Sequence, residues 1–540
     1  MVGRKASKLM TWNINDPQGD EASKIKYEIV QFTRGKGIDV GCGPKKAFPH
    51  FIGIDSCKDT ELFNIEIKPD VVCEDAANLD FIDAGTLDFV FSSHLLEHIE
   101  DYAGALANWW SKLKPGGHLV LYLPHRDLYP HIGTPGANPD HKHDLDEVMI
   151  RHVVNTLGGW ELLVEEVRDQ GMEYSFLVVY RKRADDLQLI ELPMRPDKSV
   201  CVVRYGGFGD SIQAANILPE LKRQGYHVTF MTTPRGQSIL QHDPHIDEWL
   251  IQDNDQVPNH ELSAYWDVMQ RRFDKWIQLS ESVEGTLLAF PGRANHGWPH
   301  NLRHQVMNRN YLEWTADLAE LPFRRDGRFY PSEEEVGAAR RLLADFKNML
   351  AGPIKIMERA PDRFHILWCL SGSSRHKFYP HQDGVIANIL KAMPLATIIF
   401  SGDEACKILE AGWESETRIK CTSGEMAIRD TLALAQQVNC VVGPETGVLN
   451  AVAFEEVPKV VMLSHSSAEN LTKHWHNTVA LEPQGTSCYP CHRLHFDMRF
   501  CREDAETGAA MCQKNIAPQQ VFMAIAQAYA AWDEARLETI

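Results

Sequence analysis

Residues 199–211 decide the fold, and they read Ser-Val-Cys-Val-Val-Arg-Tyr-Gly-Gly-Phe-Gly-Asp-Ser. The apolar, β-branched first half of this stretch predicts a buried parallel strand, and the three glycines after it predict a tight turn. Asp210 then stands directly before residues 212–221, an apolar segment that favours a helix. Such a turn exposes backbone N–H groups at the helix N-terminus and favours a negatively charged ligand. Because a second start of this kind lies at residues 37–44, the chain is predicted to carry out two reactions.

Length and composition set the broad class of the protein. A chain of 540 residues is expected to fold as about two to four domains. Its formal net charge of −19 argues against stable binding to nucleic acid or to an anionic membrane. No apolar run reaches the roughly 18 residues that a transmembrane helix needs, and residues 1–20 lack the apolar core of a signal peptide. We therefore expect a cytoplasmic protein without a transmembrane segment.

The first half of the chain alternates short apolar strands with polar turns. The glycine-rich stretch at 37–44 is followed by residues 51–55, a second strand that ends in Asp55. An acid at that position accepts hydrogen bonds from ribose hydroxyls in dinucleotide-binding folds. Further strands are predicted at 71–76, which ends in acids, and at 87–94.

Three motifs in this half resemble those of the class I S-adenosylmethionine-dependent methyltransferases, and of their type 11 group most closely. They are the D-V-G-C-G loop at 39–43, the S-x-x-L-E-H segment that ends at His98, and the L-K-P-G-G turn at 113–117. The resemblance covers residues 20–182 approximately. It implies that Gly41 and Gly43 let the backbone approach the cofactor, that Asp55 binds its ribose, and that Asp75 or Ala76 meets its adenine. The expected cofactor-binding set is Asp39, Gly41, Gly43, Asp55, Asp75, Ala76 and Ser92.

Methyl transfer to a hydroxyl is helped by a base, and histidines are the candidates here. His94 ends the strand predicted at 87–94, and His125 follows an apolar strand predicted at 118–123. His141 and His143 lie in the polar loop 138–144. We predict His141 and His143 as the catalytic bases, because this loop lies near the acceptor in this fold. Two alternatives stay open for the loop: its Asp and His side chains hold a divalent ion, or its histidines cap backbone groups.

Proline and mixed charge mark the joint between the two halves. Pro193 and Pro196 interrupt the apolar pattern, as linkers do. The predicted division is a methyltransferase domain at 1–185, a linker at 186–198, an N-terminal acceptor lobe at 199–350 and a C-terminal donor lobe at 351–540.

The second half repeats the strand-and-turn pattern twice. A strand at 364–370 runs into Ser, Gly and Lys residues, and another at 438–443 runs into Gly-Pro-Glu-Thr-Gly. Both turns suit a phosphate group. Two Rossmann-like halves with phosphate-type turns in the second describe the GT-B glycosyltransferase architecture. The predicted fold class is therefore α/β, with a Rossmann-like methyltransferase domain followed by a two-lobed GT-B glycosyltransferase.

Residues 199–530 resemble glycosyltransferase family nine, the ADP-heptose:lipopolysaccharide heptosyltransferases. The resemblance rests on V-V-R-Y-G-G-F-G-D-S, S-G-S-S-R-H-K-F-Y-P and V-V-G-P-E-T-G-V-L-N. It implies that Asp210 is the catalytic base of an inverting reaction, and that the glycines before it clear space for two sugars. The donor diphosphate is then held without a metal by Ser373, Ser374, Lys377, Glu445, Thr446 and Gly447.

Two residues depart from this family's pattern, and two roles have simpler alternatives. The family usually has Asp-Thr-Gly followed by a His, where this chain has Glu445 and Asn450. This departure leaves the donor and the activity open. Asp210 is alternatively a helix N-cap, and Lys377 a surface lysine.

Four of the 12 cysteines cluster near the end of the chain, and the other eight are scattered. The cluster, within residues 488–512, consists of Cys488, Cys491, Cys501 and Cys512. The first pair has the spacing of zinc ligands, so a structural zinc site and a set of reduced thiols are the two alternatives.

Together these features predict a bifunctional transferase. The front half methylates with S-adenosyl-L-methionine, and the heptosyltransferase-like back half transfers a sugar from a nucleotide-diphosphate donor to a glycan or glycolipid. Assembly of a lipopolysaccharide or capsule-like surface glycan is the simplest shared pathway. Two alternatives are a methyltransferase joined to a non-catalytic glycan- or nucleotide-binding module, and an enzyme of viral nucleic-acid hypermodification. The charge of −19 disfavours the last of these.

Overall fold

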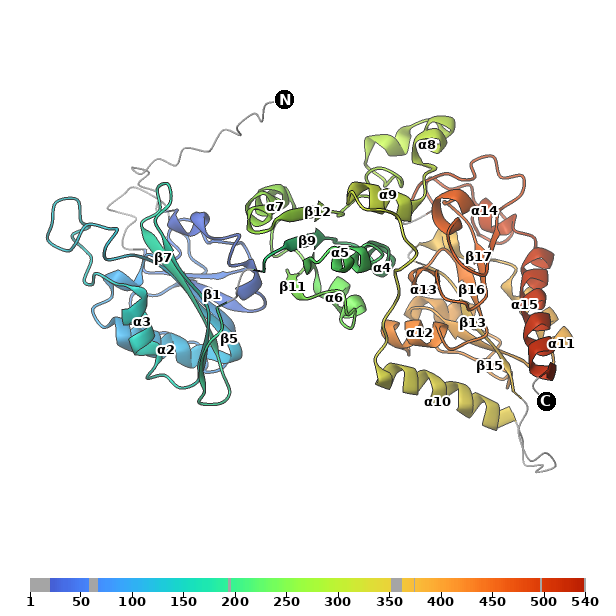
Figure 1. Ribbon diagram of the computed structural model, residues 1–540, viewed down its shortest axis with the longest axis horizontal. Helices are drawn as coiled ribbons and strands as arrows, with labels where there is room; N and C mark the ends of the chain where they lie inside the picture. Colours follow the sequence, from blue (N-terminus) through green and yellow to red (C-terminus); the bar gives the residue numbers. More distant parts are fainter. Residues whose placement is uncertain are drawn as a thin grey trace. The chain divides into compact units, whose positions relative to one another are not determined.

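The computed structural model describes residues 20–57, 67–192, 196–350, 362–372, 374–495 and 498–538, with the backbone alone at 346–350 and 375. The chain forms two compact units. The first comprises Met1–Asp197 and Ile251–Phe273, and the second comprises Lys198–Leu250 and Asp274–Ile540. Figure 1 shows the three β-sheets around which the chain is built.

The first unit is built on an eight-stranded sheet with the order β3-β2-β1-β4-β5-β7-β6-β8. Its strands are β1 (Gly37–Val40), β2 (Ile52–Asp55), β3 (Val71–Val72), β4 (Leu87–Ser93), β5 (Leu113–Pro124), β6 (Trp160–Arg168), β7 (Ser175–Lys182) and β8 (Gln188–Ile190). Strands β1 to β5 pair in parallel, and β7 runs antiparallel between β5 and β6. A largely parallel, twisted α/β sheet of this kind confirms the predicted Rossmann-like domain.

Two helices of this unit, α2 (Tyr102–Lys112) and α3 (Glu147–Val154), cover one face of the sheet (Figure 1). Asp101 caps α2 by accepting a hydrogen bond from the Gly104 N–H at 2.9 Å. Leu106, Trp109 and Trp110 follow at helical spacing and are buried against the sheet. The apolar stripe therefore fixes which side of α2 faces the core.

Residues 251–273 leave the chain's second half and pack in the first unit. They include α7 (Leu262–Met269), and the short 3-10 helix before it ends at Glu261. The Gln256 side-chain amide donates to the carbonyl oxygens of Val30 and Thr33 at 2.7 and 3.0 Å. Glu261 also pairs with Lys26 at 2.6 Å. The sequence predicted a single boundary between the halves, at the linker 186–198, and did not predict that residues 251–273 return to the first unit.

The second unit contains two parallel sheets, which we call the first and second lobes. The first lobe has the strand order β11-β10-β9-β12 and the second has the order β15-β14-β13-β16-β17-β18. The strands are β9 (Ser199–Val203), β10 (His227–Thr232), β11 (Glu248–Ile251), β12 (Lys275–Gln278), β13 (Phe364–Cys369), β14 (Ala396–Ser401), β15 (Ile419–Lys420), β16 (Cys440–Pro444), β17 (Lys459–Met462) and β18 (Thr478–Leu481). Each lobe thus has the parallel α/β sheet that the GT-B interpretation predicted.

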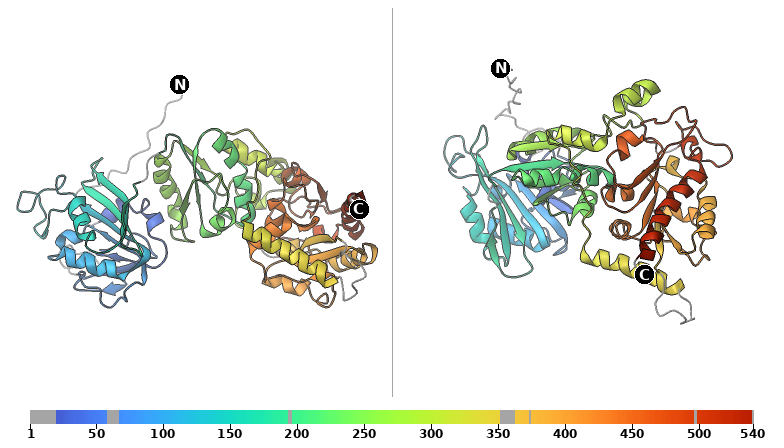
Figure 2. Two further views of the ribbon diagram at one scale, coloured as in Figure 1. Left: turned by 60° about the horizontal axis from the view of Figure 1, so that its bottom comes forward. Right: turned by 45° about the vertical axis from the view of Figure 1, so that its right-hand side comes forward.

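Helices cover both faces of the second-lobe sheet (Figure 2). The helices of the unit are α4 (Phe208–Ala215), α5 (Leu218–Arg223), α6 (Pro234–Leu240), α8 (His300–Met307), α9 (Tyr311–Leu318), α10 (Glu333–Leu350), α11 (Gln382–Ala392), α12 (Ile428–Ala435), α13 (Gly447–Ala451), α14 (Met511–Lys514) and α15 (Pro518–Glu538). One apolar core runs from Val200 and Val202 of the first lobe to Leu367 and Val441 of the second. Because the lobes share this core, residues from both can meet in one site.

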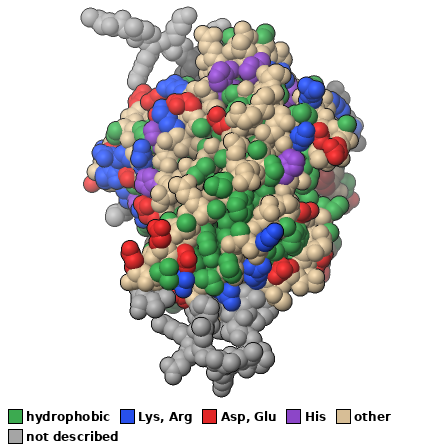
Figure 3. Space-filling model, turned by 90° about the vertical axis from the view of Figure 1, so that its right-hand side faces the viewer, with side chains coloured by type: hydrophobic (Ala, Val, Ile, Leu, Met, Phe, Trp, Pro, Cys, Tyr) green, Lys and Arg blue, Asp and Glu red, His purple; other side chains and the backbone are tan. Residues whose placement is uncertain are grey.

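The alanine-rich helix α15 packs on α11 at one side of the second lobe. Figure 3 views the side of the protein that carries α15 and shows hydrophobic side chains gathered at its centre, with charged groups around them. Val521 and Ile525 of α15 are fully buried, whereas Met523 is 55% exposed. Among the described helices, none combines the length and the apolar character needed to cross a membrane.

Candidate functional site

The first candidate site is the glycine loop that follows β1. Gly41 and Gly43 have φ angles of +76° and +56°, which glycine adopts at little cost. A Cβ atom on Gly43 would meet no atom within 4 Å, so the backbone there faces open space. Asp55, at the end of β2, accepts a hydrogen bond from the Gly43 N–H at 3.0 Å. The loop and the predicted ribose-binding acid therefore lie together.

Asp39 and Ser92 lie beneath this loop. The buried Asp39 carboxylate accepts a hydrogen bond from the Ala47 N–H at 2.9 Å, and burial raises its pKa to about 7. The buried Ser92 hydroxyl donates to the Val40 carbonyl oxygen at 2.9 Å. Both predicted cofactor residues brace the loop through its own backbone.

Asp75 and Ala76 lie just after β3, on a strand end that is exposed or half-buried. The Asp75 carboxylate accepts a hydrogen bond from the Ala77 N–H at 3.1 Å. The Ala76 carbonyl oxygen accepts one from the Trp109 indole at 2.8 Å, which ties the strand end to α2.

The two predicted histidine bases occupy different environments. The His143 Nε2 lies 3.1 and 3.0 Å from the carbonyl oxygens of Ile99 and Glu100, the backbone-capping role that the sequence left open. His141 is buried, its ring contacts those of His98 and Tyr129, and burial lowers its pKa to about 4. His141 is therefore neutral near pH 7, and burial makes it a weaker base than an exposed histidine.

Glu97 is the residue that sequence analysis missed at this site. It lies in the 3-10 helix Leu96–His98 that follows β4, and its carboxylate is fully buried beside His98 and His141. Burial raises the pKa of Glu97 to about 8. The signal in the sequence is the L-E-H motif at 96–98, which sets an acid beside an imidazole just after β4.

The backbone explains why the 138–144 loop reaches Glu97. The Lys142 N–H donates a hydrogen bond to the Glu97 carbonyl oxygen at 2.7 Å. His94, at the end of β4, has a φ of +50° and lies with Nδ1 3.8 Å from Glu97 Oε1. The carboxyl end of β4 thus gathers three imidazoles around one carboxylate.

The second candidate site is a cavity of about 490 Å³ in the second unit. Asp210 and Glu284 line it from the first lobe, and Lys377, Thr446 and Asn450 line it from the second. The structure therefore brings together the predicted base and two segments predicted to hold or adjoin the donor.

Asp210 both caps α4 and faces the cavity. Its Oδ2 accepts a hydrogen bond from the Gly207 N–H at 2.7 Å, and its Oδ1 lies 3.1 Å from Arg204 Nη2. Arg204 is buried and also donates to both carboxylate oxygens of Glu284 at 3.0 and 2.8 Å. Asp210 is thus the third residue of α4, whose carboxylate reaches back to the N-cap residue Gly207; it is not the N-cap that the sequence offered as the alternative. Glu284 is a further acid that the sequence did not single out.

Glycines at the start of α4 and α13 let the two lobes approach. A Cβ atom on Gly209 would lie 2.9 Å from Asn450 Nδ2, and one on Gly447 would lie 3.2 Å from the Gly209 nitrogen. The space that Gly209 leaves is therefore occupied by Asn450 of the chain itself, not reserved for a sugar as the sequence suggested.

Lys377 and Glu445 form the floor of the cavity. The Lys377 ammonium is buried and donates to the Glu445 carbonyl oxygen at 2.7 Å, so it is not a surface lysine. The Glu445 carboxylate accepts hydrogen bonds from the Ser464 and Ser466 N–H groups at 2.7 and 3.0 Å and pairs with His465 Nδ1 at 2.5 Å. The longer acid in place of the family's Asp thus anchors the loop 464–466.

The remaining predicted donor residues differ in position. Thr446 is the N-cap of α13 and accepts a hydrogen bond from the Leu449 N–H at 3.5 Å, beside Gly447 in the cavity wall. Ser374 is buried, and its hydroxyl is bonded to His376 and to the His495 carbonyl oxygen. Ser371 and Gly372 line the cavity instead. Ser373 lies outside the described residues.

Replacing Glu445 is expected to destabilise the second unit. Burial alone raises the pKa of this acid, but His465, Lys377 and the Ser464 N–H outweigh it and lower the pKa to about 2. Glu445→Ala should cost about 3–5 kcal/mol of unfolding free energy in urea titrations at pH 7, since it leaves buried donors unpaired. Glu425→Ala, at an exposed position, should change it by less than about 0.5 kcal/mol.

The buried Glu445 carboxylate also makes the stability of the fold depend on pH. A carboxyl with a lowered folded-state pKa stabilises the fold above its unfolded value of 4.5, and this stabilisation is lost as the pH falls from 4.5 toward 2. The gap between wild type and Glu445→Ala should therefore narrow over that range. An equal gap at pH 7 and at pH 2.5 would contradict this account.

The four clustered cysteines are all free thiols. Cys512 is buried, Cys491 and Cys501 are half-buried, and Cys488 is exposed. Burial, with a smaller contribution from the neighbouring Cys488 and Cys501 thiols, raises the pKa of Cys491 to about 12. Within the part of the chain that the structure describes, no three of these thiols come within 4.8 Å of one another. A zinc ion needs its ligands closer together than this, so the four thiols would have to move toward one another to bind it. The zinc site therefore stays a prediction.

Comparison with known proteins gives a family match within the first half of the chain. Residues 38–121 match a family model described as a methyltransferase domain, which confirms the resemblance predicted for the first half. A search of curated protein sequences gives no match. A solved SAM-dependent methyltransferase from Archaeoglobus fulgidus is 20% identical with a TM-score of 0.22, over 30% of this chain and 92% of that one.

Two solved glycosyltransferase structures also align with the chain. A glycosyl transferase family 9 structure from Veillonella parvula is 14% identical with a TM-score of 0.44, over 62% of this chain and 98% of that one. The E. coli ADP-heptose lps heptosyltransferase II is 13% identical with a TM-score of 0.42, over 62% of this chain and 100% of that one.

Proposed function

We propose that the first unit transfers a methyl group from S-adenosyl-L-methionine. The observation that carries this proposal is the open backbone at Gly43 with Asp55 across from it. There, N–H groups and a carboxylate suit the polar part and the ribose of the cofactor. The sulfonium is already activated, so alignment of the acceptor supplies most of the rate. When the acceptor is a hydroxyl and no ion occupies this site, the neutral His141 imidazole accepts its proton.

We infer that the second unit transfers a sugar from a nucleoside-diphosphate donor with inversion. The observation that carries this inference is the cavity that Asp210 shares with Lys377, Thr446 and Gly447. Asp210 takes the proton of the acceptor hydroxyl as its oxygen attacks the anomeric carbon. The C–O bond to the diphosphate breaks on the opposite face, and the departing charge meets the Lys377 ammonium and the N–H groups that begin α13.

Arg204 and Glu284 support this role of Asp210. The buried guanidinium is fixed by three hydrogen bonds, two to Glu284 and one to the Leu279 carbonyl oxygen. It holds one oxygen of Asp210 while the Gly207 N–H holds the other, so the carboxylate keeps one orientation at the cavity wall. Because the base is already oriented before the substrate binds, no conformational entropy is lost in aligning it with the acceptor hydroxyl.

The test is release of a nucleoside diphosphate from a panel of nucleotide sugars, with a lipopolysaccharide-type glycan as the acceptor. We expect one donor to be used, inversion of the anomeric configuration by NMR, and an unchanged rate in EDTA, because the charge partners are side chains and backbone groups. If the protein neither hydrolyses nor transfers any of the donors but binds a nucleotide tightly, the second unit is a non-catalytic binding module. The observation that favours this alternative is that Glu445 anchors a loop.

The fusion of the two units motivates a shared pathway. We propose that both reactions serve one surface glycan, with the product of one site as the acceptor of the other. Mass spectrometry of a glycan incubated with both donors should then show a methyl and a glycosyl increment on one molecule.

A further inference from the structure

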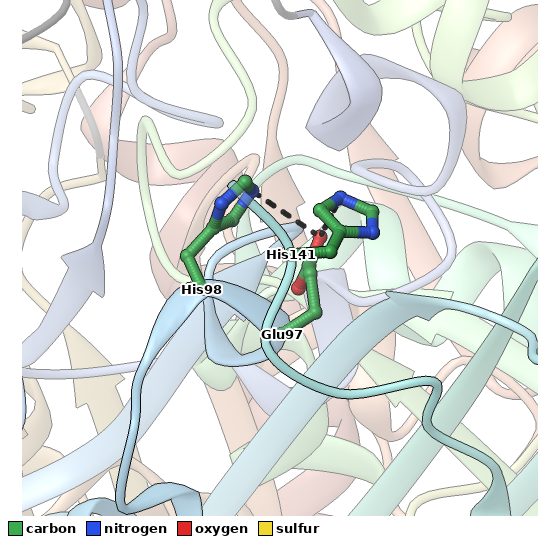
Figure 4. A group of neighbouring side chains, drawn as sticks. All are labelled: Glu97, His98 and His141. Carbon is green, nitrogen blue, oxygen red and sulfur yellow. Dashed lines mark ion pairs between the residues drawn. The ribbon is translucent and has the colours of Figure 1, made fainter. Parts of the chain in front are cut away.

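Glu97, His98 and His141 form a compact cluster at the carboxyl end of β4 (Figure 4). Glu97 Oε1 lies 3.9 Å from His98 Nε2 and 3.9 Å from His141 Nε2. Figure 4 shows the carboxylate between the two imidazole rings. Across the residues that the structure describes, this is the one group of three or more His, Cys, Asp or Glu whose ligand atoms all lie within 4.8 Å of one another.

The Glu97 carboxylate lacks the partners that burial demands. It is fully buried, and neither of its oxygens accepts a hydrogen bond from another residue. The imidazole nitrogens are too far away to donate one. A buried carboxylate without hydrogen bonds is costly, and the protein retains it where a cation or a reaction requires it.

We propose that Glu97, His98 and His141 bind a divalent first-row transition metal ion. Two imidazole nitrogens and one carboxylate oxygen are a donor set of zinc, manganese, iron and cobalt sites that keep an open position. Around a tetrahedral ion with ligands at about 2.1 Å, neighbouring ligand atoms are about 3.4 Å apart. The two distances from the carboxylate oxygen to the imidazole nitrogens therefore have to close by only about half an ångström.

His94 completes the surroundings of the ion. Its Nε2 lies 2.9 Å from the Ser175 hydroxyl, and its Nδ1 lies 3.8 Å from Glu97 Oε1. A ring whose outer nitrogen is held by a polar partner presents the other nitrogen in a fixed direction, as in many metal sites. The divalent ion that the sequence placed among the Asp and His residues of loop 138–144 thus takes only His141 from that loop. Asp144 accepts hydrogen bonds from the Ile132 N–H instead.

The ion site adjoins the cofactor loop. Glu97 follows β4, which pairs with β1, and Leu95 packs where a Cβ atom of Gly41 would lie. This inference deepens the proposed methyltransferase function: the ion would bind two neighbouring oxygens of the methyl acceptor, such as those of a vicinal diol. Binding of the ion itself does not depend on that function, so the two can be tested apart.

The test is Mn²⁺ binding to the metal-free full chain, measured from the free Mn²⁺ signal by electron paramagnetic resonance. Mn²⁺ is chosen because it prefers oxygen and nitrogen ligands to the clustered thiols. We expect one site in the wild type, a rise in Tm on Mn²⁺ addition, and at least tenfold weaker binding in Glu97→Gln and in His98→Ala. His152→Ala, at an exposed histidine of α3, should bind as the wild type does.

Equal Mn²⁺ affinity in the wild type, Glu97→Gln and His98→Ala would overturn the proposal, as would a wild type that binds none. S-adenosylhomocysteine binding to the same variants separates the two claims. A variant that loses Mn²⁺ binding but keeps its affinity for S-adenosylhomocysteine supports the metal site. Mn²⁺ binding by a wild type that does not bind S-adenosylhomocysteine would sink the methyltransferase proposal alone. Only variants whose circular-dichroism spectrum matches that of the wild type, and which are therefore folded, enter this comparison.

Discussion

Asp210→Asn should lower sugar transfer at least about 100-fold, because a general base contributes about 10²–10⁴ to such a rate. Asn keeps the size of the side chain and an oxygen that accepts from the Gly207 N–H, so α4 keeps its cap. It cannot accept the proton of the acceptor hydroxyl. The expected pattern is a fall in kcat with little change in donor affinity, measured by release of the nucleoside diphosphate.

Glu334→Gln is the matched control for this variant. Glu334 is an exposed acid at the start of α10, away from the cavity, and its replacement makes the same chemical change. Its transfer rate should stay within a factor of two of the wild type. A rate for Asp210→Asn that equals that of Glu334→Gln would show that Asp210 only caps its helix, and that another group, such as Glu284 in the same cavity wall, takes the proton.

Asp55→Ala should weaken S-adenosylhomocysteine binding by about 10- to 100-fold, the value of one or two hydrogen bonds to a charged group. The substitution removes the acid that meets the ribose and also the acceptor of the Gly43 and Cys57 N–H groups at 3.0 and 2.9 Å. Isothermal titration calorimetry with S-adenosylhomocysteine measures the change directly.

Asp83→Ala is the control for Asp55→Ala. Asp83 is an exposed acid of the same unit between β3 and β4. Its removal should leave the affinity unchanged within error. If both variants bind as tightly as the wild type, the glycine loop is not the ribose site, and the cofactor interpretation of residues 41–55 is wrong.

The fold was predictable because its strands are short apolar runs that end in polar or glycine-rich turns. Residues 199–203 and 364–369 are buried at every position, as expected for strands covered on both faces. The excursion at 251–273 was not predictable. Its anchors, Gln256 and Glu261, are ordinary polar residues whose partners, Val30, Thr33 and Lys26, lie more than 200 residues earlier in the sequence.

The sites were predictable to the extent that they lie on motifs. Gly43, Asp55, Asp210 and Lys377 stand beside turns whose residue types indicate ligands. The structure places Gly43 at an open position with Asp55 beside it, and Asp210 and Lys377 in the wall of one cavity. The Glu97 cluster was hidden because His141 lies 44 residues away and joins it only through the closure of a loop.

The remaining differences between the predicted and the observed site residues arise from burial. Ser374 carries the hydroxyl expected of a phosphate turn, but its neighbours His376 and His495 draw it into the interior. Glu445 looked like a donor ligand, yet its extra methylene lets it reach Ser464 and Ser466. No pattern in the local sequence separates a cavity-facing polar side chain from one that holds a loop.

The most direct test of a chain with two separate transferase sites is a set of thermal melts of the full chain, its Asp55→Ala variant and a Lys377→Ala variant. Each is melted with S-adenosylhomocysteine and with nucleoside-diphosphate sugars, because a ligand that binds the native state raises Tm. The account predicts that both ligands raise the Tm of the wild type, that Asp55→Ala loses the response to S-adenosylhomocysteine alone, and that Lys377→Ala loses the response to the nucleotide sugar alone. A wild type that responds to neither ligand, or variants that lose both responses together while still folded, would contradict it.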